Sequence, residues 1–157
     1  MKYFVYWWLS VCLFLTGGYF AWDLGFFEFL ALADITRLSF IILFLLSLCT
    51  ISTGSIIYKL IRTGGKYIEN SILRFFADNF TGLGLVGTVI GFMYTFWMLA
   101  PLFSGFDPSN IIAAQEIFKI LLIGTSTALS TTLVGVISSI FLNFQLELQE
   151  KVYELYI

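Results

Sequence analysis

The sequence predicts an all-α membrane protein. Hydrophobic residues make up 59% of the 157 residues and charged residues 11%, with a mean hydropathy of +0.94; an ordinary globular domain has roughly 25% charged residues. A transmembrane helix takes about 20 apolar residues, and four runs reach that length. They are 3–22, 38–58, 83–103 and 117–144, uncharged apart from Lys119. We therefore expect a single membrane domain, 1–157, with four transmembrane helices.

The first run, 3–22, follows Met1-Lys2, as the apolar core of a secretory signal would. It is longer than such a core usually is and lacks an A-x-A exit, so we expect a retained span. The stretch "WDLGFFEFLALADITR" then leads to the second run, 38–58. Its aromatic and acidic residues favour an outer loop lying at the membrane interface.

Positive charges predict the orientation, because short loops rich in lysine and arginine stay in the cytoplasm. The segment 59–80 between the second and third runs carries four of them, and each terminal region adds one. The opposite side has only two, among five acidic residues. We therefore expect both termini in the cytoplasm. We also expect 59–80 to be a short cytoplasmic segment, whose part "KYIENSILRFFADNF", 66–80, is either an amphipathic interfacial helix or the lower extension of the third span.

The third and fourth runs are joined by a second outer loop. Pro101 is expected to end the third helix, and Asp107 and Pro108 to begin the next one as cap and first residue. No proline follows Pro108, so one helix of up to about 70 Å is possible. Its end, 145–157, is expected to project into the cytoplasm with a Glu147–Lys151 pair.

Small residues recur at helical spacing in the last two runs, which indicates that these two helices pack closely. In lipid, small residues let helix backbones approach each other. The third run offers Gly84, Gly87, Thr88 and Gly91, and the fourth offers Gly124, Ala128, Thr132, Gly135 and Ser139, with Thr127, Thr131 and Ser138 on the adjoining flank. The first two runs lack this density and are expected to form an outer layer.

The hydroxyls of the fourth run allow two interpretations. Serine and threonine in membrane helices often bond only to their own backbone or to a neighbouring helix. The cluster between Thr125 and Ser139 exceeds what packing against one helix requires. A polar path lined by some of them is the alternative, and the spacing leaves both open.

The segments "GLGLVGTVIGFMYTF" and "IGTSTALSTTLVGVISSIFLNF" together resemble the paired membrane motif of the MotA/TolQ/ExbB family. The likeness covers about 78–145. It implies the channel subunit of an ion-driven motor in the bacterial inner membrane. It further implies a homopentamer whose third and fourth spans surround two copies of a single-span partner of the MotB/TolR/ExbD type with an intramembrane aspartate.

By this resemblance, Thr88 and Thr132 fall on motif threonines that surround the partner's aspartate. Thr127, expected with them on the ion pathway facing the partner, falls where TolQ and ExbB carry glutamate, so the chain departs from them there. The segment 59–80 is also much shorter than the cytoplasmic domain of most MotA relatives. The short segment therefore offers no evident surface for binding a cytoplasmic rotor.

The residues themselves agree that this chain does not relay protons alone. Its four runs contain no Asp, Glu or His, and a titratable relay needs ionisable groups at depth. A protonatable carboxylate would have to come from a partner, and hydroxyls suit a proton or sodium equally. No cofactor is implied, and no histidine, metal-spaced cysteine pair or GxSxG suggests an enzyme. The alternative function is a non-conducting membrane scaffold or assembly subunit.

Overall fold

The computed structural model describes residues 2–34, 36–63, 71–103 and 111–154. Within these ranges the chain is helical and forms no strand. The helices are α1 (Lys2–Asp23), α2 (Phe26–Ala33), α3 (Leu38–Thr63), α4 (Ser71–Phe103) and α5 (Ile111–Glu154). All but α2 are long and apolar enough to cross a membrane. The expectation of an all-helical chain with four candidate spans is therefore confirmed.

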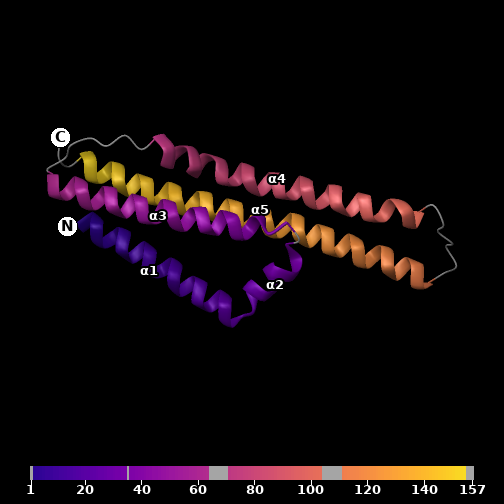
Figure 1. The fold of residues 1–157 in the computed structure, drawn as a ribbon. Coiled ribbons are helices and arrows are strands. Elements are labelled where there is room, and N and C mark those ends of the chain that lie inside the picture. Colours follow the sequence, from indigo (N-terminus) through magenta and orange to yellow (C-terminus); the bar gives the residue numbers. More distant parts are fainter. Residues whose placement is uncertain (1, 35, 64–70, 104–110, 155–157) are drawn as a thin grey trace.

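Helices α3, α4 and α5 run alongside one another, and α5 lies between the other two (Figure 1). The N-terminal end of α1 and the C-terminal end of α5 lie at the same end of the bundle, which we call the terminal end (Figure 1). At the opposite end, the hairpin end, α4 and α5 continue past the beginning of α3 as a pair. The close pairing expected for the third and fourth runs is the dominant contact of the fold.

Helix α1 diverges from the bundle, and α2 turns the chain back toward α5 (Figure 1). Gly25 makes this reversal at a φ of 71°, a left-handed conformation that glycine adopts without steric cost. Leu30 of α2 is completely buried in the main core. The stretch expected to be an outer interfacial loop therefore contains a short helix that packs partly onto the protein.

Asp34 caps the N-terminus of α3, because its carboxylate accepts hydrogen bonds from backbone amides just before and at the start of the helix. Its Oδ2 accepts from the Ser39 N–H at 2.7 Å, and its Oδ1 accepts from the Thr36 N–H at 3.1 Å and hydroxyl at 2.6 Å. Asp34 is fully buried. A carboxylate in this place satisfies amides that have no partner within the helix.

The core lies along α5 in two clusters. The larger one joins α3 to both α4 and α5 through Ile42, Leu46, Phe80 and Leu142. The smaller one lies near the terminal end and joins α1, α3 and α5 through Trp7, Ile57, Leu60, Leu148 and Val152. Many remaining apolar side chains of α1 are exposed, as suits a helix that faces lipid.

Helix α4 is continuous over 33 residues, so the part of 59–80 from Ser71 onward is an extension of the third span. The expectation that Pro101 ends this helix was wrong, because α4 continues through it to Phe103. A proline removes one backbone donor and crowds the preceding turn, but its own φ is helical. Because Pro101 lies only two residues before the end of α4, few backbone hydrogen bonds are lost. The cap expected at Asp107 and Pro108 lies outside the described residues.

Helix α5 is also uninterrupted, with 44 residues and a length of about 66 Å. This length agrees with the absence of proline after Pro108. The Glu147–Lys151 pair forms as expected, with Nζ and Oε1 2.8 Å apart. An apolar core of roughly 30 Å takes up less than half of α5, so the helix extends beyond the bilayer.

Candidate functional site

The α4–α5 interface is built from glycines whose backbones lie against the facing helix. A Cβ added to Gly84 would lie 2.9 Å from the Thr131 carbonyl oxygen and 3.2 Å from the Gly135 Cα. A Cβ on Gly135 would lie 2.6 Å from the carbonyl oxygen of Phe80. Ordinary contacts begin at about 3.4 Å, so only glycine fits at these two positions at the observed separation.

The same arrangement continues toward the hairpin end. Gly87 faces the side chain of Thr131, Gly91 faces the backbone of Ala128, and Gly124 faces the side chain of Thr95. All of these residues are buried. The helix-packing role expected for Gly84, Gly87, Gly91, Gly124, Ala128 and Gly135 therefore agrees with their positions.

This close approach brings the hydroxyls of Thr88 and Thr132 together. The two Oγ1 atoms are hydrogen-bonded to each other. Thr88 also contacts the carbonyl oxygens of Gly84 at 3.1 Å and Ala128 at 3.2 Å. Thr132 contacts the same two, Ala128 at 3.0 Å and Gly84 at 3.5 Å. Each hydroxyl thus lies within reach of one carbonyl on its own helix and one on the facing helix.

The result is a cluster of four uncharged oxygens with only two hydrogens to donate. Both threonines are half-buried, so the cluster lies at the edge of the interface. A hydroxyl can donate to a carboxylate or accept from a carboxylic acid, and carbonyl and hydroxyl oxygens are suitable ligands for hard cations. The site can therefore accommodate an ion or a protonatable group from outside the chain.

Thr127 lies elsewhere. Its hydroxyl donates to the carbonyl oxygen of Ala33, the last residue of α2, and lies 3.1 Å from the Ile123 carbonyl oxygen. Its side chain is buried. Five residues on an α-helix turn it about 140° away from Thr132. The structure brings together two of the three expected ion-path residues and places the third in the contact between α5 and α2.

The face that carries Thr88 and Thr132 continues to the terminal end as a polar strip. Asn143 and Glu150 follow Thr132 within about 20° of the same line on α5. Arg74 of α4 pairs with Glu150. A hollow of about 420 Å³ opens there, lined by Arg74, Asp78, Asn143, Leu146, Glu147 and Glu150. We call this surface, from Thr88 and Thr132 to the hollow, the polar face.

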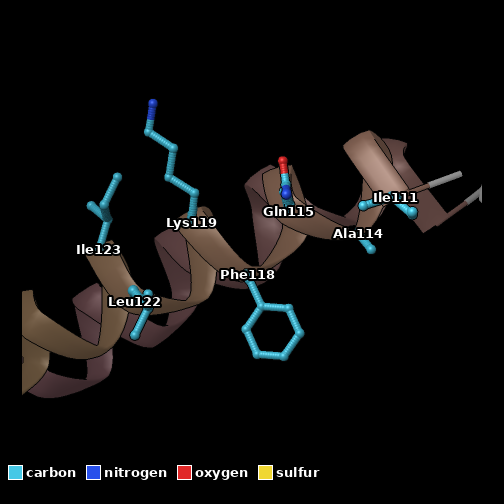
Figure 2. Close-up of a pocket in the computed structure, with 7 residues that line it drawn as sticks. All are labelled: Ile111, Ala114, Gln115, Phe118, Lys119, Leu122 and Ile123. Carbon is cyan, nitrogen blue, oxygen red and sulfur yellow. The ribbon is translucent and has the colours of Figure 1, made fainter.

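A second hollow, of about 480 Å³, lies along α5 near the hairpin end (Figure 2). Its seven lining residues all come from one helix, and most are apolar. In Figure 2, Phe118 and Lys119 point to opposite sides of α5. Side chains that diverge in this way do not converge on a ligand, so we assign no site here.

Thr95 and Asp34 were not singled out in the sequence. Thr95 is buried, donates to the Gly91 carbonyl oxygen at 2.8 Å and packs on Gly124. It continues the spacing of Gly84, Thr88 and Gly91 by four residues, which could have revealed it. Asp34 stands four residues before Leu38, further from the apolar run than an N-cap residue would be, so the usual capping signal does not point to it.

No protein-family model, no curated protein and no solved structure matches this chain. Membership of the MotA/TolQ/ExbB family therefore stays a prediction based on the two motifs.

Proposed function

We propose that this chain is the ion-channel subunit of a membrane motor driven by the ion-motive force. The observation that carries the proposal is the hydroxyl pair Thr88–Thr132, held at the edge of the tightest helix contact of the fold. The pair offers four uncharged oxygens and no titratable group. Such a site can stabilise an ion or a carboxyl group but needs a partner to supply the charge.

The proposed partner is a single-span protein of the MotB/TolR/ExbD type, present in two copies and carrying an intramembrane aspartate. Five copies of this chain would surround the two partner helices with α4 and α5 innermost, in the bacterial inner membrane with both termini in the cytoplasm. Protons or sodium ions would pass by way of the partner's aspartate, and the two threonines would hydrogen-bond its charged and neutral forms in turn. The chain itself would not be an enzyme.

The polar face supports this assignment. Arg74, Glu147 and Glu150 line the hollow at the terminal end, outside the expected spans, on the same side of the helix pair as the two threonines. The hydroxyl pair and the polar hollow would thus lie on one face, and that face would lead an ion from the pair to water at the terminal end. Facing the hydroxyl pair toward a central channel would keep it away from lipid.

The scaffold alternative also has an observation in its favour. The hydroxyls of Thr88, Thr95 and Thr132 each reach a carbonyl oxygen of their own helix four residues earlier. This is the bond that threonine makes in a membrane helix when it serves packing alone. A scaffold would therefore show the same threonine geometry without any partner.

The test has two parts. The chain is co-expressed with the product of its neighbouring gene, and native mass spectrometry gives the subunit ratio. Ion flux is then measured in proteoliposomes for Thr88→Val and for Thr95→Val, a matched control on the same face of α4. Losing a hydrogen bond to a charged group costs about 1.5–3 kcal/mol, so Thr88→Val should lower flux at least about tenfold.

Thr95→Val should leave flux within about twofold of the unmodified chain, since Thr95 bonds only its own backbone. Equal flux in both variants would remove Thr88 from the ion path. A homo-oligomer without an aspartate-bearing partner would favour the scaffold.

A further inference from the structure

A second group of polar side chains lies inside the protomer, apart from the polar face. Among the residues that the structure describes, Gln145 has no hydrogen-bond partner at either Nε2 or Oε1. Ser138 Oγ, Gln149 Oε1 and Trp7 Nε1 are likewise without one. Ser138 and Gln145 are completely buried, and Gln149 and Trp7 are more than nine-tenths buried. We call these four residues the interior seam.

Three members of the interior seam lie on one line of α5. At about 100° per residue, Ser138, Gln145 and Gln149 fall within an arc of about 40°. Val152 lies about 20° beyond this arc and packs with Trp7 of α1 and with Ile57 of α3. The interior seam therefore faces α1 and α3, whereas Thr132 lies about 100–140° away around the helix.

This position excludes lipid, a second copy and a partner helix as sources of hydrogen bonds. The four side chains are already covered by helices of the same protomer. An oligomer formed through the polar face or through lipid-facing surfaces would leave them covered in the same way. Whatever satisfies these atoms has to be small enough to lie between packed helices.

Leaving the atoms unsatisfied would be costly. A buried donor or acceptor without a partner costs about 1–3 kcal/mol, and the interior seam holds five such atoms. The chemistry of the set is complementary to water: the indole N–H only donates, the amide donates and accepts, and the hydroxyl does both. Buried water typically makes about three hydrogen bonds to groups of this kind.

We propose that the interior seam binds a file of water molecules that enters from the terminal end of the bundle. The file runs from Gln149 to Ser138, about 16 Å along α5. It ends there, because the next hydroxyls on this side are already bonded: Thr131 donates to the Thr127 carbonyl oxygen at 3.0 Å, and Thr127 donates to Ala33. The interior seam is thus a closed-ended hydrated site and not a conduction path. It does not depend on the proposed motor function.

Cysteine accessibility tests the proposal in the intact protein. In a background with Cys12→Ala and Cys49→Ala, single cysteines are placed at Gln145 and at Ala77 of α4, which are equally buried. Membrane vesicles are exposed to hydroxyl radicals generated from water by X-ray radiolysis, and oxidation of each cysteine is followed by mass. We expect the cysteine at 145 to react at least tenfold faster than the one at 77, because only the former touches water. Equal rates would overturn the proposal.

A second variant keeps the test decisive if a cysteine disturbs folding. Gln145→Met preserves the length of the side chain and removes both unpartnered atoms. If the interior seam is hydrated, this change breaks the file, lowers the Tm and slows modification of a cysteine placed at Ser138. If the interior seam is dry, removing two unsatisfied atoms raises the Tm, and that result would refute the water file.

Discussion

The pair of variants Gly84→Ala and Gly82→Ala tests the close packing on which the hydroxyl site depends. Both glycines lie in α4, two residues apart. A Cβ at Gly84 would meet three backbone atoms of α5 at 2.9–3.2 Å, whereas a Cβ at Gly82 would meet nothing within 4 Å. The two substitutions are chemically identical and differ only in what the new methyl group touches.

The magnitude follows from these distances. An ordinary contact needs about 3.4 Å, so an alanine at Gly84 would push the helices apart by about half an ångström. Overpacking of this kind costs about 1–3 kcal/mol. Alanine also gains up to about 1 kcal/mol in helix propensity, but both variants gain it alike. Gly84→Ala should therefore be about 1–3 kcal/mol less stable than Gly82→Ala.

The free energies are measured by titrating the protein with SDS in mixed micelles and following tryptophan fluorescence and near-ultraviolet circular dichroism. Gly82→Ala should match or exceed the unmodified chain. Separation at Gly84 should also weaken the Thr88–Thr132 bond, which lies one turn further along α4. Equal stability of the two variants would show that the helices are not this close, and the reasoning for the hydroxyl site would fail with it.

Three further predictions concern the contacts at the two ends of α2. Thr127→Val removes the hydrogen bond to the carbonyl at the end of α2, so the free energy of unfolding should fall by about 1 kcal/mol and amide hydrogen exchange in α2 should accelerate. An accompanying loss of ion flux would instead place Thr127 in the ion path. Asp34→Ala removes the cap of α3 and should lower the free energy of unfolding, measured by thermal unfolding, by about 0.5–2 kcal/mol, and Asp34→Asn should lower it by less. Unchanged stability in Asp34→Ala would mean that the cap is dispensable. Gly25→Ala forces a left-handed conformation on alanine and should lower the free energy of unfolding by about 1–2 kcal/mol, whereas Gly17→Ala, equally open around its Cβ, should not lower it. Equal effects of the two substitutions would rule out backbone strain as the cause.

The sequence was informative wherever one helix could be considered by itself. Length and apolar composition predict the spans, since a helix that crosses a bilayer must satisfy its backbone internally and present apolar side chains. The spacing of Gly84, Thr88 and Gly91, and of Gly124, Ala128 and Thr132, likewise places each set on one face. These properties depend on local geometry alone, and the helices and their buried faces agree with them.

Only the tertiary structure decided which faces meet. Thr127 and Thr132 look alike in the sequence, yet one bonds α2 and the other meets Thr88. The return of α2 onto the core and the complete burial of Gln145 had no local signal either. The physical reason is that lipid is as apolar as a leucine side chain, so hydrophobicity does not distinguish a face that contacts another helix from one that contacts the membrane. Close packing and hydrogen bonds make that choice, and they exist only once the helices are assembled.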